Sequence, residues 1–77
     1  MGMLNTTKAI IRFTTKMGMT ARPDAILKTE NLIGAVCLAK TILSTDNREV
    51  YTYSIEHKGR VHHYGADYHN KIGSNPA

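Results

Sequence analysis

The chain has 77 residues and a formal net charge of +4, from ten Lys and Arg against six Asp and Glu. This length allows one small domain with a modest core, which we place at residues 1–66. The single cysteine, Cys37, excludes an internal disulfide, the N-terminal segment has no secretory signal pattern, and no stretch approaches the roughly 20 apolar residues of a membrane span. We therefore expect a cytoplasmic protein without a membrane segment.

The first predicted element is a strand over 6–16, because apolar and polar residues alternate there. One face would be buried, and the other would carry most of the basic residues of this half of the chain. Residues 17–24 include Gly18 and Pro23 and are predicted to form a loop. Residues 25–28 fit either a short second strand or the first turn of a helix.

A helix is predicted over about 30–44. Thr29 is a suitable N-cap, and Glu30 would interact favourably with the helix dipole. One side of the helix is apolar, since hydrophobic residues recur at i, i+3 and i+4 spacing. These residues are Leu32, Ala35, Val36, Ala39, Ile42 and Leu43.

The next predicted element is a hairpin that begins with the alternating segment 51–56. A three-residue loop over 57–59 would place Ile55 opposite Val61 and put a glycine at the left-handed position of the turn. The alternative is a two-residue loop, which would place Val61 opposite Glu56. We prefer the three-residue loop because it pairs two aliphatic residues, and we expect residues 67–77 to form a flexible tail.

These elements predict an α+β fold, a small two-layer sandwich with one helix packed on a mainly antiparallel sheet of three to four strands. The element order is strand, optional short strand, helix, strand, strand. The apolar positions of the strands are expected to form the core. They are Ala9, Ile11, Phe13, Tyr51, Tyr53, Ile55 and Val61.

The histidines near the C-terminus are the right residue type for a metal site, with Asp67 close by. Adjacent residues of a strand face opposite sides, so His62 and His63 cannot both bind one ion, and His69 alone does not complete a site. The chain has no zinc motif, and Cys37 lies in the middle of the predicted helix rather than at its N-terminus. We therefore predict no metal, no cofactor and no catalytic activity.

The side of the helix that faces away from its apolar stripe is poor in charge, and it carries Gly34, Leu38 and Thr41. A glycine inside a helix costs about 1 kcal/mol relative to alanine, which indicates a close-packed neighbour. We predict a non-enzymatic protein-binding module that uses these three residues to bind a protein partner or a second copy. Very small domains of this kind are common among accessory and inhibitor proteins of phages and mobile elements.

The alternative function is nucleic-acid binding by the outer face of the sheet. In the preferred register this face combines cations that could neutralise phosphates with rings on which bases of single-stranded nucleic acid could stack. The residues are Lys8, Arg12, Lys16, His62 and Tyr64.

Overall fold

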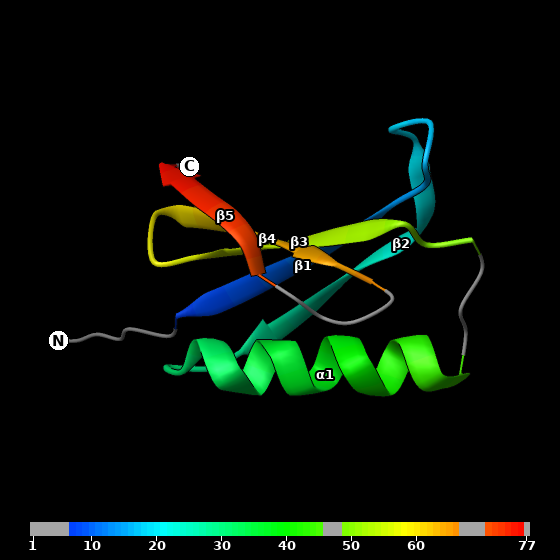
Figure 1. The fold of residues 1–77 in the computed structure, drawn as a ribbon. Coiled ribbons are helices and arrows are strands. Elements are labelled where there is room, and N and C mark those ends of the chain that lie inside the picture. The colour runs from blue at the N-terminus through cyan, green and yellow to red at the C-terminus, as the bar shows by residue number, and fades with distance from the viewer. Residues whose placement is uncertain (1–6, 46–48, 67–70, 77) are drawn as a thin grey trace, which may run out of the picture.

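A computed structural model describes residues 7–45, 49–66 and 71–76 (Figure 1). It has one helix and five strands in chain order: β1 (Lys8–Thr14), β2 (Thr20–Lys28), α1 (Leu32–Thr45), β3 (Thr52–His57), β4 (Arg60–Gly65) and β5 (Lys71–Pro76). In these parts of the chain, no helix combines the length and the apolar character needed to cross a membrane.

The strands form one antiparallel sheet in the order β2-β1-β3-β4-β5. Since β1 is antiparallel to both of its neighbours, β2 and β3 run parallel, and α1 connects them by passing over β1. The helix covers one face of the sheet, and no described helix or strand covers the other, which we call the open face (Figure 1). The predicted α+β architecture with one helix on a sheet is confirmed, but the sheet has five strands rather than three to four.

The core lies between α1 and the two central strands. As predicted, the side chains of Ala9, Ile11 and Phe13 are buried on β1, and those of Tyr53 and Ile55 are buried on β3. On the helix only Ala35 and Ala39 are fully buried, so the sheet approaches α1 most closely at two small residues. The core is therefore built mainly from strand side chains.

Two residues expected in the core lie outside it. Tyr51 precedes β3 and is 55% exposed, and Val61 is only partly buried because it lies opposite Glu56 on the open face. The place of Val61 follows from the hairpin, which has the two-residue loop that we did not prefer. Lys58 and Gly59 have φ values of 51° and 78°, as a two-residue turn of type I′ requires.

The hairpin register follows from the packing of tyrosine rings. In this register Tyr64 lies opposite Tyr53 on the helix side, with ring centroids 5.1 Å apart and nearly parallel planes. Burial of a second aromatic ring contributes more than the pairing of Ile55 with Val61 would. The expected pairing of aliphatic residues was therefore wrong, because it considered neighbours within one pair of strands and not the core as a whole.

Residues 25–28 belong to β2 and are a strand rather than a helical turn. The strand is longer than expected, since it begins at Thr20 and pairs with β1 along most of its length. The pairing is irregular opposite Arg12, where β2 carries Pro23 and Asp24. Such an irregularity accommodates a proline that has no N–H for the ladder.

The helix begins at Leu32, two residues later than expected. Asn31 is the residue before the first helical turn, and its carbonyl accepts from Gly34 N–H at 3.1 Å. The Thr29 hydroxyl accepts from the N–H of Asn31 at 3.1 Å and therefore caps the turn that precedes the helix. Thr29 is thus not the N-cap of α1.

The expected flexible tail over 67–77 was wrong for its described part, because Lys71–Pro76 form β5 and pair with β4. This segment has little intrinsic preference for a strand, and only residue 72 has a large apolar side chain. The unpaired edge of β4 supplies main-chain partners that the local sequence does not reveal. The polar segment is therefore a strand because of its neighbour.

Candidate functional site

The solvent side of α1 presents Ile33, Cys37, Lys40, Thr41 and Ser44, which we call the helix strip. All five are exposed, and at about 100° per residue they fall within roughly 100° of arc. Ile33 is 75% exposed, and Lys40 is the one charged member of the strip. A surface helix normally carries several charges on this side, so the strip is unusually poor in charge for a helix in contact with water, and it exposes one large apolar side chain, Ile33.

The three residues predicted to contact a partner lie at different depths. Thr41 is in the helix strip, and its hydroxyl donates to the carbonyl of Cys37 at 3.0 Å. Leu38 is partly buried and packs against the core, because the buried side of α1 is centred on Ala35 and Ala39 rather than on the larger residues beside them. Sequence reasoning therefore overlooked Ile33, which the rotated helix leaves in solvent.

Gly34 has a close-packed neighbour within its own chain. An ideal Cβ at this position would lie 2.9 Å from Oγ1 and 3.6 Å from Cβ of Thr29. The same hydroxyl accepts from Asn31 N–H and donates to the Asn31 carbonyl, so it is held in place by two hydrogen bonds. The glycine thus has an intramolecular explanation, and it gives no independent support to a partner at the helix.

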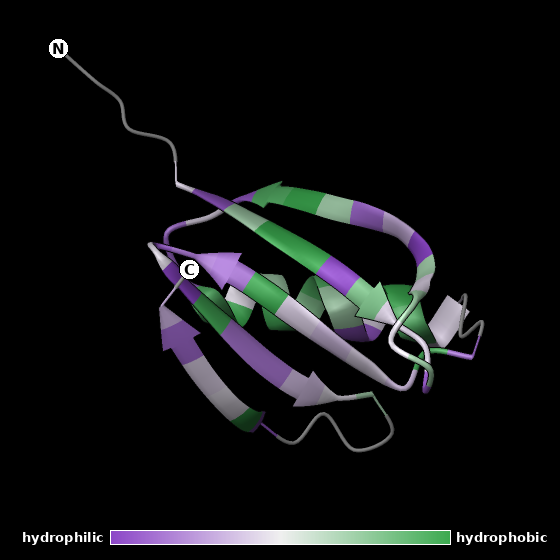
Figure 2. Cartoon of the chain, turned by 90° about the horizontal axis from the view of Figure 1, so that it is seen from above, coloured by the Kyte–Doolittle hydropathy of each residue, from purple (hydrophilic) through white to green (hydrophobic). Residues whose placement is uncertain are grey.

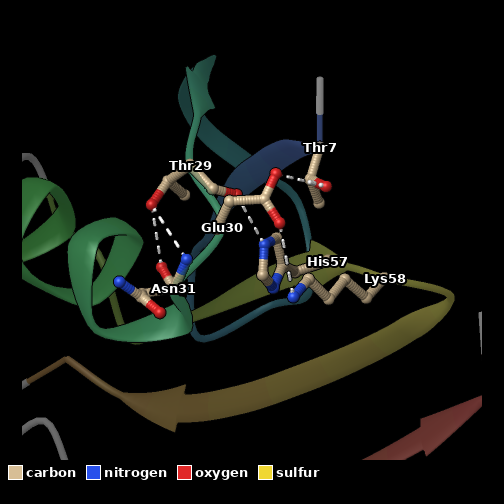
Figure 3. Close-up of polar contacts among 6 residues, drawn as sticks. All are labelled: Thr7, Thr29, Glu30, Asn31, His57 and Lys58. Atoms are coloured by element: carbon tan, nitrogen blue, oxygen red, sulfur yellow. Dashed lines mark hydrogen bonds and ion pairs between the residues drawn. The ribbon is translucent and has the colours of Figure 1, made fainter. Parts of the chain in front are cut away.

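A network of polar contacts anchors the N-terminal end of α1 to the sheet (Figure 3). Glu30 accepts from the Thr7 hydroxyl at 3.1 Å and pairs with Lys58 at 3.7 Å. His57 is 5% exposed, and its Nε2–H donates to the carbonyl of Thr29 at 2.9 Å. These contacts join the residue before β1, the end of β3 and the β3–β4 turn to the segment before the helix, and they fix the orientation of this end of α1.

The open face of the sheet carries polar and apolar positions side by side, as seen from above in Figure 2. Arg12 lies at its centre and contacts two carboxylates, Glu56 at 3.0 Å and Asp24 at 3.7 Å. Next to this group, Ile10 lies opposite Ile26, which is 63% exposed. The cation expected to bind phosphate at the centre of this face is therefore already paired within the chain.

The residues predicted to bind nucleic acid are divided between the two faces. Tyr64 is buried in the core, and His62 lies opposite Ile55 on the helix side. Lys8 and Lys16 are exposed, but Lys16 lies in the turn after β1 and not on the sheet. The structure does not bring the five residues together, and the expected stacking partner, Tyr64, does not lie on the open face.

The tyrosine pair on the helix side has the chemistry of a core rather than of a binding platform. Burial, together with the neighbouring Tyr64 hydroxyl, raises the pKa of Tyr53 to about 12. Burial likewise raises the pKa of Tyr64. Both phenols therefore stay neutral to higher pH than an exposed tyrosine, because desolvation disfavours the charged form.

The histidines do not form a metal site in the described residues, where no group of three or more ligating side chains occurs. Residues 67 and 69, which were considered as ligands, lie outside the described residues. His62 and His63 face opposite sides of β4 as expected, and His63 Nε2 donates to Asn75 Oδ1 at 2.7 Å. Desolvation, followed by nearby positive charges of which Lys71 is the largest, lowers the pKa of His62.

Comparisons of this chain with protein families, with curated proteins and with solved structures give no significant match. Its function is therefore inferred from the geometry of the chain itself.

Proposed function

We propose that this chain is a small protein-binding module without catalytic activity, and that the helix strip of α1 is its contact surface. The proposal rests on one observation above all: Ile33 is 75% exposed on a helix side where Lys40 is the one charged residue. Burial of an isolated isoleucine of this kind by a partner contributes about 1.5–3 kcal/mol. An apolar groove on a larger protein would supply that burial.

The anchoring of the helix supports this proposal. A module that binds through one helix loses less entropy on binding if that helix already has its bound orientation. The contacts of Glu30 and His57 provide such preorganisation at one end of α1. As an accessory or inhibitor protein, the chain would act by occupying a surface of a larger protein.

The experiment is affinity capture of a partner from a lysate of the cells in which the protein occurs, with Ile33→Glu as the test variant. A matched control is Met17→Glu, which introduces the same charge at another exposed apolar residue, 84% exposed and outside the helix. We expect one defined partner to be captured by the wild type and by the control but not by the test variant. Equal capture by all three proteins, or by none, would contradict the proposal, provided that circular dichroism shows each to be folded.

Nucleic-acid binding remains the alternative prediction, and the separation of its five residues leaves it with less support. Its direct test is a titration with a labelled single-stranded oligonucleotide at low and near-physiological salt. Binding with a linear log–log salt dependence that weakens on Lys8→Glu would favour this alternative over the helix strip.

A further inference from the structure

The edge of the sheet at β2 has a segment suited to pairing with another strand. β2 is the outermost strand, and its residues 24–28 are exposed at every second position. Thr29 N–H donates to the carbonyl of Thr7, so positions 25, 27 and 29 point their main-chain groups toward β1. By alternation, the main-chain groups of Asp24, Ile26 and Lys28 point away from the sheet.

The rest of the sheet edge is protected in the ways that natural proteins use. The first half of β2 contains Pro23 and an irregular register, and both discourage pairing with another strand. At the other edge, β5 is short, polar and ends in Pro76. The segment 24–28, by contrast, has a regular register from Ala25 to Lys28 and three consecutive apolar residues.

Lys28 is in an unfavourable position in the isolated chain. It lies directly opposite Lys8 on the open face. Because residues 7 and 29 form a hydrogen-bonded pair, Lys8 and Lys28 form a non-hydrogen-bonded pair, the type in which side chains lie closer together. Like charges opposite each other destabilise a sheet. Within the described residues, neither ammonium group has a carboxylate partner.

We propose that a second copy of this chain pairs antiparallel with the free edge of β2, on a two-fold axis at Ile26. In this register Ile26 faces Ile26 of the second copy, and Lys28 faces its Asp24. The sequence Asp24-Ala25-Ile26-Leu27-Lys28 is thus complementary to itself in charge as well as in apolar character. Each Lys28 gains a carboxylate partner, which the described residues of its own chain do not supply, and Asp24 is shared between this lysine and Arg12 of its own chain at 3.7 Å.

The main-chain groups agree with the same register. In an antiparallel pair centred on Ile26, Asp24, Ile26 and Lys28 of one copy form hydrogen bonds with Lys28, Ile26 and Asp24 of the other. These are the residues whose main-chain N–H and C=O groups point away from β1. The proline at position 23 lies outside the paired segment. The interface is isologous, with the same residues contributed by both copies, and therefore closes as a dimer.

The dimer would have a continuous sheet of ten strands. A two-fold axis between antiparallel strands is perpendicular to the sheet, so both helices lie on one face and both open faces on the other. The apolar pair of Ile10 and Ile26 then meets its copy in one row across the dimer interface. The helix strip stays outside this interface, so the inference is independent of the proposed function.

The first test is the oligomeric state, measured by sedimentation equilibrium from micromolar to millimolar concentration. We expect a dimer that Ile26→Pro converts to a monomer, because proline removes the N–H that points toward the second copy and leaves the ladder to β1 intact. In hydrogen exchange, the amides of Ile26 and Lys28 become protected as the protein concentration rises. A wild type that is monomeric up to millimolar concentration, or a dimer that survives Ile26→Pro, would overturn the inference.

A charge exchange tests the register without a change in backbone. Lys28→Asp and Asp24→Lys each place like charges opposite one another twice per dimer, and we expect each to weaken dimerisation about tenfold. The double variant restores opposite charges and should recover most of the affinity. Lys71→Asp is the matched control for Lys28→Asp, since it makes the same change in net charge at an exposed residue of β5, the opposite edge strand, and leaves the affinity unchanged.

The outcomes separate this inference from the proposed function. Loss of the dimer in Ile33→Glu but not in Ile26→Pro would place self-association at the helix and refute the β2 interface. No recovery in the double charge variant would refute the register.

Discussion

The hydroxyl of Thr29 leaves no room for a Cβ at position 34, which explains the glycine there. A double-mutant cycle can test this explanation. Gly34 is the third residue of α1, and an alanine within a helix is favoured over glycine by about 0.5–1 kcal/mol. At position 34, however, the added Cβ would lie 2.9 Å from Thr29 Oγ1 and would displace it from its two hydrogen bonds with Asn31. Loss of such a hydroxyl contact costs about 1 kcal/mol.

The two effects of Gly34→Ala should nearly cancel in the wild-type background. Thr29→Ala removes the obstacle at a cost of about 1 kcal/mol, and in that background Gly34→Ala should then stabilise the fold by about 1 kcal/mol. The expected coupling between the two positions is therefore about 1 kcal/mol, above the usual error of a few tenths. A change of this size corresponds to about 4–8 °C in Tm for a domain of 60–100 residues.

The assay is urea unfolding of the four proteins, followed by circular dichroism at one fixed low concentration so that association does not contribute. The slopes must agree among the variants for the free energies of unfolding to be compared. If Gly34→Ala stabilises the wild type by as much as it stabilises the Thr29→Ala protein, the hydroxyl is not the reason for the glycine. The close-packed neighbour would then have to be sought in a partner.

Three further predictions concern protonation and the hairpin turn. Because the pKa of Tyr53 is raised to about 12, the folded state retains a proton that the unfolded chain releases near pH 10. The free energy of unfolding should therefore fall between these pH values, by on the order of 3 kcal/mol. Urea midpoints at pH 9 to 12 measure this fall, and Tyr53→Phe should lessen it. The pKa of His62 is lowered, so its contribution to the free energy of unfolding is present above its ordinary pKa of about 6.5 and is lost as pH falls below that value. His62→Gln should therefore flatten the decline in the free energy of unfolding between pH 7 and pH 5. An unaltered slope would exclude this histidine as the cause. Lys58 has a φ of 51°, a conformation that asparagine adopts more readily than lysine. Lys58→Asn should therefore raise the free energy of unfolding by about 0.5–1 kcal/mol. A decrease would show that the ion pair of Lys58 with Glu30 stabilises the fold more than the substitution improves the turn.

The sequence by itself determined the elements whose cause is local. Alternation predicts the strands around Ile11 and Ile55, and i, i+3, i+4 spacing predicts the helix, because these periods follow from backbone geometry alone. The buried apolar residues of β1 and β3 were identified in the same way, although Tyr51 was wrongly included and the burial of His57 was not anticipated. The low charge on the outer side of α1 likewise follows from the residue types at helical spacing.

The tertiary structure decided the features that depend on contacts between distant segments. The hairpin register follows from the stacking of Tyr64 on Tyr53, which moves His62 and Tyr64 away from the open face. The strand at 71–76 forms because the edge of β4 offers main-chain partners, although its own residues do not favour a strand. Gly34 is required by the hydroxyl of Thr29, and the opposition of Lys8 and Lys28 arises from the pairing of β1 with β2. A local pattern indicates which faces a segment has, but only the packing of the whole chain determines what each face meets.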